Sequence, residues 1–95
     1  MAASPQHATL VASTITTFTF DTDFTRVEVL NVDGAAAVYF TVDGADPTVA
    51  GTGCHVIPAA IGAVEVAAAP NASVAAGTVV KLISSGIPKV SARGV

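Results

Sequence analysis

The chain alternates apolar and polar residues over several short stretches, and this period of two is typical of half-buried β-strands. Residues 24–32 read FTRVEVLNV, which places Val27 and Val29 on one side. Arg26 and Glu28 fall on the other side. The pattern predicts a strand in a sheet that turns one face to the core and the other to water.

Two further stretches carry the same signal. Residues 36–42, AAVYFTV, alternate with Phe40 on the predicted core side. Residues 9–20, TLVASTITTFTF, are dense in Thr, Val, Ile and Phe, which fit a pleated, half-buried surface. They predict a strand with Phe18 and Phe20 on one face.

The tetrapeptide Val-Asp-Gly-Ala occurs twice, at 32–35 and 42–45. Asp-Gly between alternating stretches is the strongest short-range hairpin signal, so Asp33-Gly34 predicts a tight hairpin between the strands on either side. The second copy opens into a longer loop, DGADPTVAGTG, which we expect to be an exposed contact surface. Gly34 and Gly44 are expected to adopt a positive φ.

The carboxyl-terminal half predicts four more short strands. Residues 54–58, CHVIP, 78–84, TVVKLIS, and 89–95, KVSARGV, are strand-like runs between turn residues. In AAIGAVEVAAAP the alternation of residues 63–66 favours a strand. One helical turn near residues 59–62 is the competing possibility, because alanine favours helices.

About seven to eight short strands separated by turn residues predict an all-β fold, a single small antiparallel β-sandwich or barrel. A chain of 95 residues is long enough for one compact domain. We expect residues 1–8 to be a flexible N-terminal tail and residues 9–95 to be the single β domain.

The composition favours a protein that works within an assembly. Apolar residues make up 52% of the chain, but it contains no Trp and only four Phe, so the core consists mostly of small side chains. Charged residues are 12%, about half of the roughly 25% that is usual for soluble proteins. A surface with so few ions is easily desolvated when it meets another protein.

Charge and cysteine content exclude several classes of protein. The net charge is −3, and the basic residues Arg26, Lys81, Lys89 and Arg93 are scattered along the chain, which disfavours nucleic acid as a partner. The single cysteine, Cys54, excludes an intrachain disulfide. The amino terminus MAASPQHATLVAS lacks the pattern of a secretory signal. The sequence contains no uninterrupted run of about 20 apolar residues, so we expect no membrane partner.

Acidic residues raise the possibility of a cation site or a carboxylate pair. Asp33, Asp43 and Asp46 could supply oxygen ligands, but the closing Glu of a calcium-binding loop is absent, and turn formation explains them better. Glu28 and Glu65 lie in predicted strands facing solvent, where they are interpreted as solubilising charges rather than as catalytic groups.

Other chemistry is equally weakly indicated. Cys54 and His55 are adjacent, and neighbouring side chains of a strand point to opposite faces, so they are not expected to form a catalytic pair. Together with His7 they offer at most three metal ligands, whereas structural zinc usually takes four. No phosphate-binding or serine hydrolase motif occurs. We therefore predict no catalytic, cofactor-binding or metal-binding residues, no cofactor, and no enzyme activity.

The chain resembles small β-rich virion proteins of tailed bacteriophages, particularly those that infect actinobacteria. The resemblance lies in VEVLNVDGAAAVYFTVDGADPTVAG at 27–51, HVIP at 55–58, VVKLISSG at 79–86 and KVSARGV at 89–95. It implies a structural virion protein, most simply a capsid decoration, or cement, protein. Such a protein is made in the host cytoplasm and binds the major capsid protein on the capsid exterior, often as a trimeric homo-oligomer.

Two other functions remain open at this point. The resemblance also covers a tail or head-to-tail structural component. A carbohydrate-binding β-sandwich module is a further alternative, and it would present an exposed aromatic patch near Tyr39.

Overall fold

The computed structural model describes residues 5–20, 24, 26–42, 45–68 and 78–94. This part of the chain contains eight β-strands and no helix. The strands are β1 (Gln6–Thr9), β2 (Thr16–Thr19), β3 (Arg26–Asn31), β4 (Val38–Thr41), β5 (His55–Ile57), β6 (Ala63–Ala68), β7 (Val79–Ile83) and β8 (Lys89–Gly94). The predicted all-β fold class is therefore confirmed.

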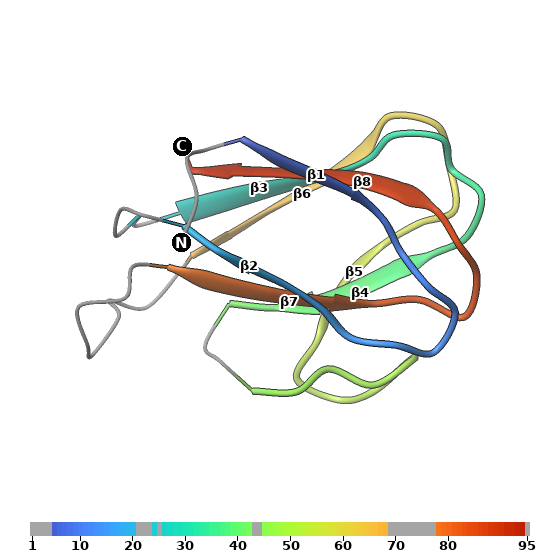
Figure 1. Ribbon diagram of the computed structural model, residues 1–95, viewed down its shortest axis with the longest axis horizontal. Coiled ribbons are helices and arrows are strands. Elements are labelled where there is room, and N and C mark those ends of the chain that lie inside the picture. The colour runs from blue at the N-terminus through green and yellow to red at the C-terminus, as the bar shows by residue number, and fades with distance from the viewer. Residues whose placement is uncertain (1–4, 21–23, 25, 43–44, 69–77, 95) are drawn as a thin grey trace.

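The strands form two antiparallel sheets of four strands each, stacked as two layers (Figure 1). The first sheet has the order β1-β8-β3-β6, and the second has the order β2-β7-β4-β5. Each sheet ends in two edge strands, so the sheets do not close on one another. Of the two predicted architectures, the structure is a sandwich and not a barrel.

The predicted hairpin at Asp33-Gly34 is wrong. Strand β3 lies in the first sheet, where it pairs with β6 and β8, whereas β4 lies in the second sheet between β5 and β7. Residues 32–37 therefore cross from one sheet to the other. Successive strands change sheet at every connection except that between β4 and β5, so distant parts of the chain form most of the pairs.

The crossing from β3 to β4 is held by the side chain of Asn31, which is fully buried. Its Nδ2 donates hydrogen bonds to the carbonyl oxygens of Ala36 at 2.9 Å and Pro58 at 3.0 Å. Its Oδ1 accepts a hydrogen bond from the backbone N–H of Gly34 at 3.1 Å. The amide thus joins the crossing to the segment that follows β5.

Gly34 has the positive φ that its place after Asp33 predicted, at +65°. It also packs closely, because a Cβ placed there would lie 2.5 Å from the backbone nitrogen of Ile61 and 2.6 Å from the carbonyl carbon of Ala60. Gly44, the second predicted turn glycine, lies outside the described residues.

Gly34→Ala is expected to lower the free energy of unfolding by roughly 2–3 kcal/mol, because it combines an unfavourable φ with a backbone clash. Gly53→Ala is the matched control, since Gly53 has a φ of +82° but no atom within 4 Å of its Cβ position. It should lose only about 1 kcal/mol. Urea unfolding of both variants measures the difference, and equal losses would show that the close approach at Gly34 is unimportant.

Strand β1 lies partly in the segment predicted as a flexible tail. Gln6 to Thr9 pair with β8 in a continuous register that runs from Gln6 opposite Ala92 to Thr9 opposite Lys89. Residues 6–8 therefore belong to the first sheet, and that part of the tail prediction is corrected. The sequence QHAT has little strand propensity of its own, so its conformation depends on pairing with β8.

The core lies between the two sheets and draws on alternate residues of both. Phe18 and Phe20 are buried on one face of the chain, as predicted, and Phe40 is fully buried on β4. The contiguous core cluster consists of Leu10, Phe18, Phe20, Val27, Val29, Val38, Phe40, Val42, Ile57, Ala67, Val80, Leu82, Val90 and Ala92. Valine and alanine make up eight of these fourteen residues, so three phenylalanine rings fill much of the core.

The strands predicted in the carboxyl-terminal half are all present as β5 to β8. The strand interpretation of residues 63–66 is confirmed by β6. The competing helical turn does not form, because residues 58–63 make two short hydrogen-bonded turns instead. These turns carry Ala60 and Ile61 against Gly34.

Candidate interaction surface

Strand β6 turns its valines away from the core. Val64 and Val66 are 48% and 46% exposed, whereas Ala67 is buried. Glu65 lies between the two valines and so points to the inner side, where its carboxylate is 4.0 Å from Nδ1 of His55 on β5. Glu65 meets solvent as predicted, with its side chain 42% exposed, but it does so at the margin between the two sheets rather than on the outer face.

The exposed valines continue an apolar strip across the first sheet. On the neighbouring strand, Leu30 is directly opposite Val64, and Glu28 is opposite Val66. Directly opposite residues in antiparallel strands share a face and lie about 4.5–5.5 Å apart at Cβ. Leu30, Val64 and Val66 therefore form an apolar strip along the β6 edge of the outer face of the first sheet, the face turned away from the second sheet.

Strands β8 and β1 complete this outer face. Ser91 lies opposite Leu30 on β3, and His7 on β1 lies opposite Ser91. At one end of the face, Lys89 pairs with Thr9. The row that crosses all four strands through Leu30 thus changes from polar at β1 to apolar at β6.

The fold gathers basic residues that are far apart in the sequence. Arg26 on β3 and Arg93 on β8 lie at one end of the outer face, and Lys89 lies at the other end. Arg93 forms an ion pair with Glu28, with 2.6 Å between Nη2 and Oε1. Three of the four Lys and Arg residues of a chain with net charge −3 therefore share one face.

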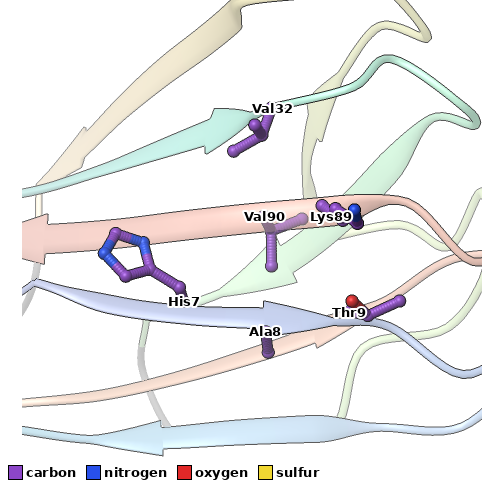
Figure 2. A pocket seen from close by; sticks show the side chains of 6 residues that line it. All are labelled: His7, Ala8, Thr9, Val32, Lys89 and Val90. Carbon is purple, nitrogen blue, oxygen red and sulfur yellow. The ribbon is translucent and has the colours of Figure 1, made fainter.

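Two shallow hollows mark the outer face near β1. One has a volume of about 300 Å³ and is lined by His7, Ala8, Thr9, Val32, Lys89 and Val90 (Figure 2). The other, of about 260 Å³, is lined by Pro5, His7, Glu28, Leu30, Ser91 and Arg93. Small-molecule sites usually measure about 300–1,000 Å³ and enclose their ligand, so these hollows suit side chains of a partner protein better.

The aspartates of the two Asp-Gly segments have separate partners. Oδ1 of Asp33 accepts hydrogen bonds from the backbone N–H groups of Lys89 at 3.1 Å and Ala35 at 3.2 Å. Asp46 instead binds Nζ of Lys81 on the second sheet at 2.9 Å. Asp43 lies outside the described residues. Asp33 and Asp46 thus have structural partners on different sheets and do not converge.

Acid is expected to destabilise the protein through Asp33. The hydrogen bond from the Lys89 backbone, followed by that from Ala35, holds the pKa of the Asp33 carboxyl below its usual range. Since the folded-state pKa is below the unfolded value, the stabilisation is present above that unfolded value, about pH 4. It is lost as the pH falls through the lower, folded-state pKa.

Urea unfolding at a series of acidic pH values measures this loss. Asp33→Asn should flatten the decline of stability with falling pH, because an amide keeps an acceptor oxygen but does not titrate. Asp46→Asn is the control and leaves the two hydrogen bonds of Asp33 in place. If Asp33→Asn declines as steeply as the wild type, another group is responsible for the acid sensitivity.

The residues considered as nucleophile or metal ligands do not come together. His7 is on the outer face of β1, while His55 is on β5 in the other sheet, with its ring centroid 5.1 Å from that of Phe40. Cys54 is half-buried, and its thiol contacts the carbonyl oxygen of Thr48 at 3.8 Å. Within the described ranges, no group of three or more His, Cys, Asp or Glu residues could hold a metal ion.

Tyr39 lies on the outer face of the second sheet. It is half-buried between Val56 on β5 and Ile83 on β7, its register partners. The described strands place no second aromatic side chain on that face. A sugar-binding platform there would consist of this one ring.

Comparisons with known proteins add no relative. No family model matches the chain, and neither a curated protein nor a solved structure is significantly similar to it. In the part of the chain that the structure describes, no helix is long and apolar enough to span a membrane.

Proposed function

We propose that the protein is a structural component of a virion, a capsid decoration protein that binds the exterior of an assembled shell. The observation that supports this most directly is the outer face of the first sheet, where half-exposed Val64 and Val66 extend the apolar strip from Leu30. Larger exposed apolar patches usually mark protein interaction sites. The resemblance to tailed-phage virion proteins agrees with this function.

Such a protein stabilises a shell by adding buried area across the joints between shell subunits. Its partner is the major capsid protein, and a homo-oligomer, such as a trimer, would place several equivalent faces on one joint. A standard protein interface buries about 1,600 Å² in total. Repeated over a whole shell, contacts of this size stabilise the particle without any single strong interaction.

The test uses empty shells assembled from the major capsid protein encoded in the same genome. The purified protein is expected to bind them saturably, in a copy number comparable to that of the shell subunits, and to raise the temperature at which the shells dissociate. Sedimentation with quantitative gel analysis and calorimetry measure the two effects. Absence of binding refutes the decoration function, and a few copies per virion would instead indicate a tail or head-to-tail component.

A further inference from the structure

The outer face of the first sheet combines an apolar strip along its β6 edge with basic residues near both ends of its strands. Leu30, Val64 and Val66 form this strip, as the register of β3 and β6 requires. Lys89 lies at one end of the face, and Arg26 and Arg93 lie at the other. Glu28 is the one acidic residue that the described strands place on this face. Even with Asp33 of the adjoining loop included, basic residues outnumber acidic ones.

Building on the decoration function, we propose that this face docks onto the shell and that its partner is an apolar protein surface bordered by carboxylates. The apolar strip supplies area that is favourable to bury, and the basic residues complement acidic groups at the rim of the contact. The hollows beside His7 would receive side chains of the partner (Figure 2).

Charge argues against a second copy as the occupant of this face. A face-to-face contact between two copies would bring Arg26, Lys89 and Arg93 of one chain towards the same basic residues of the other. Juxtaposed like charges at an interface are unfavourable by several kcal/mol. The remainder of the chain is acidic, so oligomer contacts are better placed on other surfaces.

Nucleic acid fits this face less well than an acidic protein does. Phosphate binding needs cations along the whole path of the backbone, whereas here the uncharged pair Leu30 and Ser91 separates Lys89 from Arg26 and Arg93. One of the three cations, Arg93, is already paired with Glu28 at 2.6 Å. The described residues of this face also include no Phe, Tyr or Trp on which bases could stack.

Strand addition at the edges of the first sheet is also disfavoured. Edge strands are commonly protected by inward-pointing charges, by proline or by shortness. On β6, Glu65 points to the inner side beside His55. On β1, only four residues form the strand, and Pro5 precedes them. A partner would therefore contact side chains of the face rather than backbone groups of an edge.

Two double variants and a matched control test the face with the same empty shells. Val64→Thr with Val66→Thr removes apolar surface but keeps the β-branched shape, and Arg26→Gln with Lys89→Gln removes two positive charges. Each double variant is expected to weaken shell binding at least about tenfold, and the second to lower its dependence on salt. Val56→Thr, on the second sheet, is the control, because Val56 is 50% exposed. It should bind within about twofold of the wild type.

The wild-type protein provides an independent test by amine labelling. Lys89 lies on the outer face of the first sheet and Lys81 lies on the second sheet. Binding to shells should protect Lys89 from acetylation and leave the labelling of Lys81 unchanged. This comparison needs no variant, so it holds even if a substitution impairs folding.

The outcomes separate this inference from the decoration function. If the wild type does not bind shells, the function itself is wrong. If it binds while Lys81 is protected, or Val56→Thr is the weak variant, the function stands and the docking face is wrong. If light scattering shows that the valine variant is a monomer while the wild type is an oligomer, the face binds another copy of the chain and the inference fails. If the wild type binds duplex DNA instead of shells, the face binds nucleic acid and the inference also fails.

Discussion

Asn31→Asp is expected to lower the free energy of unfolding by about 3–5 kcal/mol at neutral pH. The Asn31 side chain is fully buried, and its two amide hydrogens are donated to the carbonyl oxygens of Ala36 and Pro58. A carboxylate of the same shape has no hydrogen to donate, so it would set a buried charge against two oxygen atoms. Unpaired buried charges cost about 3–5 kcal/mol, which approaches the roughly 5–15 kcal/mol total stability of a domain.

Asn31→Ala separates the charge from the lost hydrogen bonds. It leaves the Gly34 N–H and the two carbonyl groups without their partner but introduces no charge, so we expect a smaller loss of about 2–3 kcal/mol. Circular dichroism and urea unfolding measure both variants. If Asn31→Asp is as stable as Asn31→Ala, the side chain does not donate both hydrogen bonds, and the account of the crossing is wrong.

The sequence predicted the orientation of a strand best where charged residues show which of its two sides faces water. In β3, Arg26 and Glu28 must face water, so Val27 and Val29 face the core, as the structure shows. In β6 every residue except Glu65 is alanine or valine, and the alternation alone favours putting the charge outside. The structure turns Glu65 inward because β6 is an edge strand, where the margin between the sheets is open to water.

Local turn chemistry predicted a conformation but not a partner. Gly34 has the expected positive φ, yet the turn leads into the other sheet rather than into a hairpin. Strand β3 pairs with β6 and β8, which lie more than 30 residues further along the chain. Such pairings depend on how two whole sheets cover a common core, and no short stretch contains that information.

The candidate surface could not be predicted from the sequence for the same reason. Arg26, Lys89 and Arg93 look scattered along the chain, but the register of β3 and β8 brings them to one face. Val64 and Val66 look like core residues by composition. Only the strand order, which makes β6 an edge strand and sets which side of it faces out, shows that they are exposed.

Phe40→Ala is expected to lower the free energy of unfolding by about 3–5 kcal/mol. Phe40 is fully buried on β4, an inner strand of the second sheet, opposite Leu82 on β7 and His55 on β5. The chain has four phenylalanines and no tryptophan, so few other side chains can fill the space that this ring leaves. Urea unfolding should show a lower midpoint with an unchanged slope.

Tyr39→Ala is the matched control, because it removes a similar ring from the adjacent position on the same strand. Tyr39 is only half-buried and lies on the outer face of the second sheet, so its loss opens no internal cavity. We expect its effect to be less than half that of Phe40→Ala. Since the two positions share a strand and a sheet and differ in the face on which they lie, the ratio of the two losses reports which face of β4 covers the core. Equal losses would mean that the outer face is also packed against something, and that β4 is buried on both sides.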